Sequence, residues 1–111
     1  VNMSSRGAVH GQLKTEVPYA TSKGAVDSFT YGLAHEVADQ GIRVVGLRPS
    51  MTLTDMFVAE GGEEALRKRA EQVVPMGRPG RAEEPAAAAV WLCSSEASYI
   101  TGTCLDVGGG R

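Results

Sequence analysis

The sequence has little of what marks several specialised classes of protein. Its two cysteines, Cys93 and Cys104, form no C-x-x-C pair, and a disulfide scaffold would be denser, so a reducing compartment is indicated. Positive charge is not in excess, because 11 Lys and Arg face 13 Asp and Glu, whereas nucleic-acid and membrane-surface proteins need a basic patch. No apolar run approaches the roughly 20 residues that span a bilayer. We expect a cytoplasmic protein that binds neither nucleic acid nor membrane.

Metal-ligand spacing is lacking too. His10 and His35 stand far apart and no run of His, Cys, Asp or Glu has the spacing of a metal site, so we expect no metal. What is present is ordinary globular composition, with 42% hydrophobic and 22% charged residues in a chain of 111, enough for one small domain. The chain opens Val1-Asn2-Met3 inside what resembles a strand. We expect a piece of a longer protein.

Hydrophobic periodicity predicts the helices and strands. Apolar residues at helical spacing between Pro18 and Gly41 form a stripe of Val26, Phe29, Leu33 and Val37, which predicts a helix over 18–40. The run IRVVGL at 42–47 predicts a strand buried on both faces. Four further segments complete the pattern: a strand tail at 1–5, helices at 63–73 and 82–94, and a strand at 103–107. A loop is expected at 6–17.

The resulting order is strand, helix, strand, helix, helix, strand. Such an alternation predicts right-handed crossovers and a parallel sheet of the α/β class. Three parallel strands cannot close a core, because the strand before residue 6 would keep an exposed apolar edge. The rest of the sheet is therefore expected to lie elsewhere.

Tyr19 and Lys23 are the sharpest candidates for chemistry. A spacing of four residues places both side chains on one face of a helix. A neighbouring ammonium favours the phenolate form of a phenol, and such a pair can act as a general acid and base on an alcohol or carbonyl oxygen. The alternative is a partly buried tyrosine beside a solvated lysine, and the pair alone does not decide between them.

Two other segments are expected to meet this pair. Ser5 lies where the first strand gives way to a loop, and residues 49–54 (PSMTLT) directly follow the second strand. Ligands of open α/β sheets bind outside the carboxyl ends of the strands. Ser5, the start of the Tyr19 helix and residues 49–54 should therefore gather at one edge of the sheet.

Four segments together resemble a known family. NMSS (2–5), YATSKGAVDSFTYGLAHEVADQGIRVVGLRPS (19–50), TLTDM (52–56) and SSEASYITGTCLDVGGG (94–110) resemble the C-terminal half of a short-chain dehydrogenase/reductase, in the branch of 3-oxoacyl carrier-protein reductases and glucose 1-dehydrogenase-like enzymes. The resemblance covers essentially the whole chain. It implies that residues 1–111 are the C-terminal portion of one Rossmann-type domain, a doubly wound parallel sheet in three α/β/α layers that is incomplete here.

The resemblance also implies roles for individual residues. Tyr19 would be the catalytic acid and base, Lys23 would favour its phenolate and bind the nicotinamide ribose, and Ser5 would polarise the oxygen of an alcohol or carbonyl substrate. Residues expected to contact NAD or NADP are Tyr19, Lys23, Pro49, Ser50, Thr52 and Thr54. Ser50 stands where the family usually has glycine, which adds a side chain beside the nicotinamide. Residues 55–76 would form a mobile substrate loop.

Three further expectations follow from the same resemblance. The helix Ala82–Ser94 and the strand Thr103–Val107 would form the interface of a homo-oligomer, a dimer or tetramer. The glycine-rich loop that binds the coenzyme's phosphates does not occur in these residues, since no helix follows Gly108–Gly110. The alternative to an NAD(P)-dependent oxidoreductase is therefore a truncated inactive fragment, or a related fold used for binding or assembly.

Overall fold

The computed structural model describes residues 1–11, 16–58 and 61–111, except the side chains of residues 57 and 58. Their elements are, in chain order, β1 (Asn2–Met3), α1 (Gly7–His10), α2 (Val17–Val37), β2 (Val45–Pro49), β3 (Thr52–Leu53), α3 (Asp55–Val58), α4 (Gly62–Val73), β4 (Gly80–Arg81), α5 (Glu83–Cys93) and β5 (Thr103–Val107). Short 3-10 helices, Ala38–Gln40 and Ser95–Ala97, follow α2 and α5.

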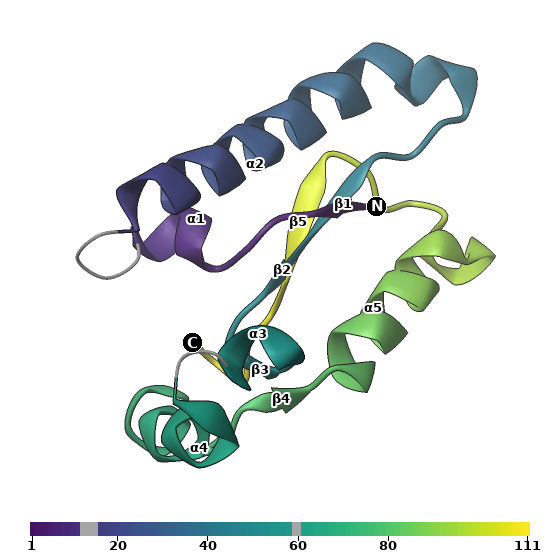
Figure 1. Cartoon of the computed structure of the whole chain (residues 1–111). Coiled ribbons are helices and arrows are strands. Elements are labelled where there is room, and N and C mark those ends of the chain that lie inside the picture. Colours follow the sequence, from purple (N-terminus) through teal and green to yellow (C-terminus); the bar gives the residue numbers. More distant parts are fainter. Residues whose placement is uncertain (12–15, 59–60) are drawn as a thin grey trace.

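The main sheet is parallel and has the order β1-β2-β5. Its longest ladder pairs Val45 with Thr103 and continues to Pro49 with Val107. Helix α2 covers one face of this sheet and α5 the other (Figure 1). A parallel sheet between helices confirms the α/β class predicted from the order of elements.

Two clusters of buried apolar side chains hold these elements together. Val45 and Leu47 of β2 pack on Leu92 of α5, with Ala88, Ala89, Ile100 and Val107 around them. The second cluster joins the segment after β2 to α4 through Met51, Leu66, Ala70 and Val74. In Figure 1, α4 accordingly lies beside the short β3–β4 pair, away from the main sheet.

Most predicted elements are present, with shifted bounds. The strand at 103–107 is confirmed, as are the helices predicted at 18–40, 63–73 and 82–94, allowing one to three residues at each end. The strand predicted at 42–47 is displaced to Val45–Pro49, because its ladder with β5 begins only at Val45.

The first predicted loop is partly wrong. Residues 7–10 form the one-turn helix α1, whose end is set by Gly11 in the left-handed region at φ 70°. Residues 55–76, a substrate loop by the resemblance, contain α3 as well as α4, the helix predicted at 63–73. Residues 12–15 of the first loop and 59–60 of the second lie outside the described residues.

The apolar stripe of α2 is partly buried. Val26, Leu33 and Val37 are half-buried and Phe29 is 58% exposed. The buried residues of this helix are Asp27, Thr30 and Ala34, because a charged pair described below takes part in the contact with β2.

Within the described ranges, none of the helices combines the length and the apolar character that crossing a membrane takes.

Candidate functional site

A cleft of about 620 Å³ opens at the carboxyl ends of β1 and β2. This is the edge at which an open parallel sheet binds its ligands. The cleft brings together all the site residues predicted from the sequence, which line it in common: Ser5, Tyr19, Lys23, Pro49, Ser50, Thr52 and Thr54.

Ser5 is held in the turn between β1 and α1. The backbone continues the pairing of β1 beyond Met3, since Ser4 N–H donates to the Leu47 carbonyl (2.8 Å) and Arg6 N–H to the Pro49 carbonyl (3.0 Å). Ser5 Oγ accepts the Gly7 N–H at 3.0 Å. Its hydroxyl proton is therefore left for another acceptor in the cleft.

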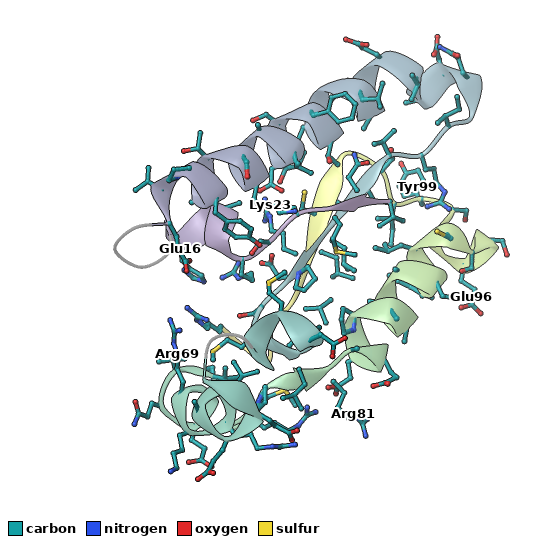
Figure 2. The ribbon with its side chains drawn as sticks, viewed as in Figure 1. Glu16, Lys23, Arg69, Arg81, Glu96 and Tyr99 are labelled. Atoms are coloured by element: carbon teal, nitrogen blue, oxygen red, sulfur yellow. The ribbon has the colours of Figure 1, made fainter. Side chains whose placement is uncertain are left out.

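Tyr19 and Lys23 lie on successive turns near the start of α2. Lys23 Nζ is 5.8 Å from the centroid of the Tyr19 ring and donates to the Met3 carbonyl at 3.0 Å. Tyr19 is 41% exposed, and its hydroxyl has no hydrogen-bond partner recorded among the described residues. Figure 2 shows Lys23 on the side of α2 that faces the sheet.

The segment after β2 is fixed through its backbone. Ser50 N–H donates to the Val107 carbonyl at 3.1 Å, and Gly80 N–H donates to the Met51 carbonyl at 2.8 Å. Thr52 Oγ1 donates to the Ser50 carbonyl at 3.0 Å, so its side chain serves the turn. Thr54 is exposed and its hydroxyl is open to the cleft.

Ser50 directs its side chain toward the end of β5. A Cβ placed on Gly108 would lie only 2.8 Å from Ser50 Cβ. Ser50 Oγ is buried and finds no hydrogen-bond partner among the described residues. The side chain that the resemblance placed beside the nicotinamide thus packs against Gly108.

An ion pair that was not predicted from the sequence joins α2 to β2. Arg48 of β2 donates to Asp27 Oδ2 from Nε at 2.9 Å, and its Nη2 lies 2.9 Å from the same oxygen. Arg48 also donates to the Tyr31 hydroxyl at 3.1 Å, and Cys104 Sγ donates to Asp27 Oδ1 at 3.4 Å. The sequence did hold one signal for Asp27, because it follows Lys23 by four residues, which is one helical turn.

Burial and hydrogen bonding act on this pair in opposite directions. Burial by itself would raise the pKa of Asp27, but the hydrogen bonds from Arg48 and Cys104 and the charge of Arg48 outweigh it, so the pKa is lowered. Burial would likewise lower the pKa of Arg48, and the bond to Asp27 raises it instead. Burial, followed by the bond to Asp27, raises the pKa of the Cys104 thiol.

The cleft also carries charged side chains besides Lys23, and of these Arg6, Arg69, Arg111 and Glu16 were not predicted from the sequence. Five cationic or titratable basic groups line it, with one carboxylate side chain among the lining residues: Arg6, His10, Lys23, Arg69 and Arg111, and Glu16. Burial, and then the like charges of Arg69 and Arg6, lower the pKa of Arg111. In Figure 2, Glu16 and Arg69 extend toward each other from facing sides of the cleft.

In the part of the chain that the structure describes, no three His, Cys, Asp or Glu residues are grouped as metal ligands.

Comparison with known proteins identifies the family. A family model described as Enoyl-(Acyl carrier protein) reductase matches residues 1–111. The chain is 49% identical over 111 residues to the uncharacterized oxidoreductase YgfF of Escherichia coli (strain K12), covering 100% of this chain and 44% of that protein. It is 42% identical over 111 residues to glucose 1-dehydrogenase 2 of Bacillus subtilis (strain 168), covering 98% of this chain and 43% of that protein.

A solved structure gives the same result. The 3-ketoacyl-(acyl-carrier-protein) reductase from Brucella melitensis, complexed with NADH, superposes with a TM-score of 0.84 and 38% identity, covering 99% of this chain and 42% of that one. Fold and sequence thus define a member of an α/β family whose named relatives are oxidoreductases. The chain belongs to the short-chain dehydrogenase/reductase family, which confirms the resemblance seen in the sequence. It spans less than half the length of each of these relatives.

Proposed function

We propose that the protein carrying this chain is an NAD(P)-dependent oxidoreductase that interconverts an alcohol and a carbonyl on a small molecule. Residues 1–111 would be the C-terminal portion of its single Rossmann-type domain, and it would act in the cytoplasm. The observation that supports this best is the shared cleft, to which the β1–α1 turn contributes Ser5 and α2 contributes Tyr19 and Lys23. Its 620 Å³ falls in the range of about 300–1,000 Å³ of small-molecule sites.

The residues that line the cleft fit a nicotinamide coenzyme. Lys23 has three donors and uses one on the Met3 carbonyl, so the others can reach ribose hydroxyls, together with Tyr19. Pro49, Ser50 and Thr52 would border the nicotinamide through their backbone, and Thr54 offers a free hydroxyl. When bound, the coenzyme supplies the acceptor or donor of a hydride, which accounts for both electrons of the reaction.

The chain's own residues would handle the proton. In oxidation the alcohol loses a hydride from carbon and a proton from oxygen, and the Tyr19 phenolate takes that proton. In reduction the Tyr19 hydroxyl returns a proton to the carbonyl oxygen as the carbon gains the hydride. Ser5, whose oxygen already accepts the Gly7 N–H, would donate its hydroxyl proton to the substrate oxygen.

Replacing Tyr19 by phenylalanine tests this function. In the protein produced from its complete gene, Tyr19→Phe should lower kcat about 10²–10⁴-fold, the usual scale for a positioned acid and base. Circular dichroism should be unchanged, since no hydrogen bond to this hydroxyl is recorded among the described residues. The matched control is Tyr99→Phe, because Tyr99 is fully exposed and lies away from the cleft (Figure 2).

Two results would contradict the function. One is turnover by Tyr19→Phe at the rate of the unaltered protein. The other is a complete protein that oxidises or reduces no alcohol or carbonyl compound with either NAD(H) or NADP(H), which would favour an inactive or purely binding member of the family.

The same protein would assemble with copies of itself. Helix α5 leaves Val90 71% exposed and Trp91 partly exposed, and Leu105 of β5 is exposed as well. Apolar residues gathered on an exposed surface mark an interaction site. We propose that α5, within the predicted helix Ala82–Ser94, and β5 form the interface of a homodimer or homotetramer.

A further inference from the structure

One side of the cleft carries positive charge that the proposed proton transfer does not use. Arg69 reaches it from α4, while Arg6 and Arg111 come from the β1–α1 turn and the segment after β5. Glu16 is the one carboxylate side chain among the described residues that line the cleft. A concave surface with such an imbalance attracts anions.

Arg69 is set apart from its neighbours on α4 by the lack of a partner. Arg67 pairs with Glu63 at 2.6 Å and Lys68 with Glu64 at 3.0 Å, each one turn back along the helix. The position four residues before Arg69 is Ala65 and the position four after it is Val73. Among the residues that the structure describes, Arg69 therefore enters no ion pair, and it points into the cleft (Figure 2).

Arg111 is positioned by contacts that leave its guanidinium unpaired in the described part of the chain. Arg6 Nε donates to the Arg111 carbonyl at 2.8 Å, and the Arg111 N–H donates to the Gly108 carbonyl at 3.2 Å. The charge of Arg6 is itself met by Asp106, at 2.6 Å. Arg111 is half-buried beside the like charges of Arg69 and Arg6, an arrangement that an anion would relieve.

We propose that Arg69 and Arg111 bind an oxyanion, a carboxylate or a phosphate, carried by the substrate whose carbonyl or alcohol lies at Tyr19. This inference rests on the proposed function. The paired N–H donors of a guanidinium can form bidentate hydrogen bonds with either a carboxylate or a phosphate. Glu16 is repelled by the same anion, so its charge opposes binding and lowers the preference of the site for anions over neutral molecules.

Matched pairs of substrates test the proposal on the protein produced from its complete gene. One series runs from 3-oxo to 7-oxo straight-chain carboxylates, each compared with its neutral amide, and dihydroxyacetone phosphate is compared with dihydroxyacetone. We expect kcat/KM to be at least tenfold higher for one anionic member than for its neutral partner. Arg69→Gln and Arg111→Gln should each lower that ratio about tenfold, as the loss of a charge-assisted hydrogen bond does, and Glu16→Gln should raise it.

The matched control is Arg67→Gln, which removes the same charge from the same helix outside the cleft and should leave the ratio unchanged. Turnover with no preference for any anionic member would overturn the inference while the proposed function stands. So would variants of Arg69 and Arg111 that weaken only the binding of NADH or NADPH, because the anion would then belong to the coenzyme.

A binding measurement decides the matter without turnover. Equilibrium dialysis with radiolabelled inorganic phosphate should show binding that Arg69→Gln and Arg111→Gln weaken about tenfold and Arg67→Gln does not. Equal binding by all three variants would overturn the anion site. If the complete protein has no activity but Arg69→Gln and Arg111→Gln still weaken phosphate binding, the result would support the anion site. It would then contradict only the proposed oxidoreductase function.

Discussion

Ser50 and Gly108 show how two residues in contact constrain each other. The side chain of Ser50 is buried and needs space beside the end of β5. The structure finds that space at Gly108, where an added Cβ would lie 2.8 Å from Ser50 Cβ and 3.0 Å from the Arg111 carbonyl oxygen. Because glycine has no side chain, Gly108 leaves space for the side chain of Ser50.

This contact predicts a coupled effect on stability. Gly108→Ala should lower the free energy of unfolding by about 1–3 kcal/mol, the usual cost of an extra methyl in a packed site. Adding Ser50→Gly should restore part of that loss, because one of the two clashing atoms is removed. Urea unfolding of the single and double variants gives the coupling, expected at about 0.5–2 kcal/mol.

Gly32→Ala is the control for this cycle. Gly32 lies in α2 with nothing within 4 Å of an added Cβ, so alanine there should raise stability by about 0.5–1 kcal/mol through helix propensity. Strictly additive effects of Gly108→Ala and Ser50→Gly would show that the two residues do not share a site.

At the scale of elements, the Asp27–Arg48 pair joins α2 to β2. It lies one helical turn beyond Lys23, on the helix that carries Tyr19, and is nearly enclosed, with side-chain exposures of 10% and 14%. Ser4 Oγ donates to the Lys23 carbonyl at 3.1 Å and fixes the same turn to β1. These contacts hold the start of α2 against the carboxyl edge of the sheet, where the cleft opens.

Replacing Asp27 by asparagine should weaken the contact between α2 and β2 in a pH-dependent way. The folded protein lowers the pKa of Asp27 below its unfolded value of about 3.9, so the stability it contributes is complete above that pH and is lost as pH falls toward the folded pKa. At pH 7, Asp27→Asn should lower the free energy of unfolding by about 1–3 kcal/mol. The difference in this free energy between the variant and the unaltered protein should narrow below about pH 4.

Chemical unfolding between pH 3 and pH 7 measures this difference. Asp39→Asn is the control, since Asp39 is exposed in the turn after α2 and should change stability little at any pH. A cost for Asp27→Asn that stays constant across this range would argue that the charge of Asp27 is not what holds α2 in place.

The same region shows what the sequence could predict and what it could not. Proline at Pro18 and glycine at Gly41 are local signals, and they bounded α2 to within a few residues. The ion pair that joins α2 to β2 was not predicted, because its two residues lie 21 apart in the sequence and meet only in the fold. The placement of Ser5, Tyr19 and Lys23 at one edge followed from the parallel order of strands, whereas Arg69 and Arg111 reach the cleft only through tertiary packing.

At the scale of the whole molecule, the exposed apolar residues include some on β1, α2 and α5. Met3 lies on β1, an edge of the sheet; Phe29 lies on α2; and Val90 and Trp91 lie on α5. In the proposed domain, further strands would pair with β1. The surface of α5, on the opposite face of the sheet from α2, is the one that we assign to contact between copies.

That assignment predicts which substitution separates the copies. Val90→Glu places a charge at the centre of the α5 surface, where burying it against a second copy would be costly, so the mass measured by analytical ultracentrifugation should fall to that of a monomer. Val73→Glu is the matched control, because Val73 is 43% exposed at the end of α4. An unchanged mass for Val90→Glu, or dissociation by both variants alike, would place the interface elsewhere. Dissociation by Val90→Glu alone would mean that Val90, which is 71% exposed in this chain, is covered by a second copy.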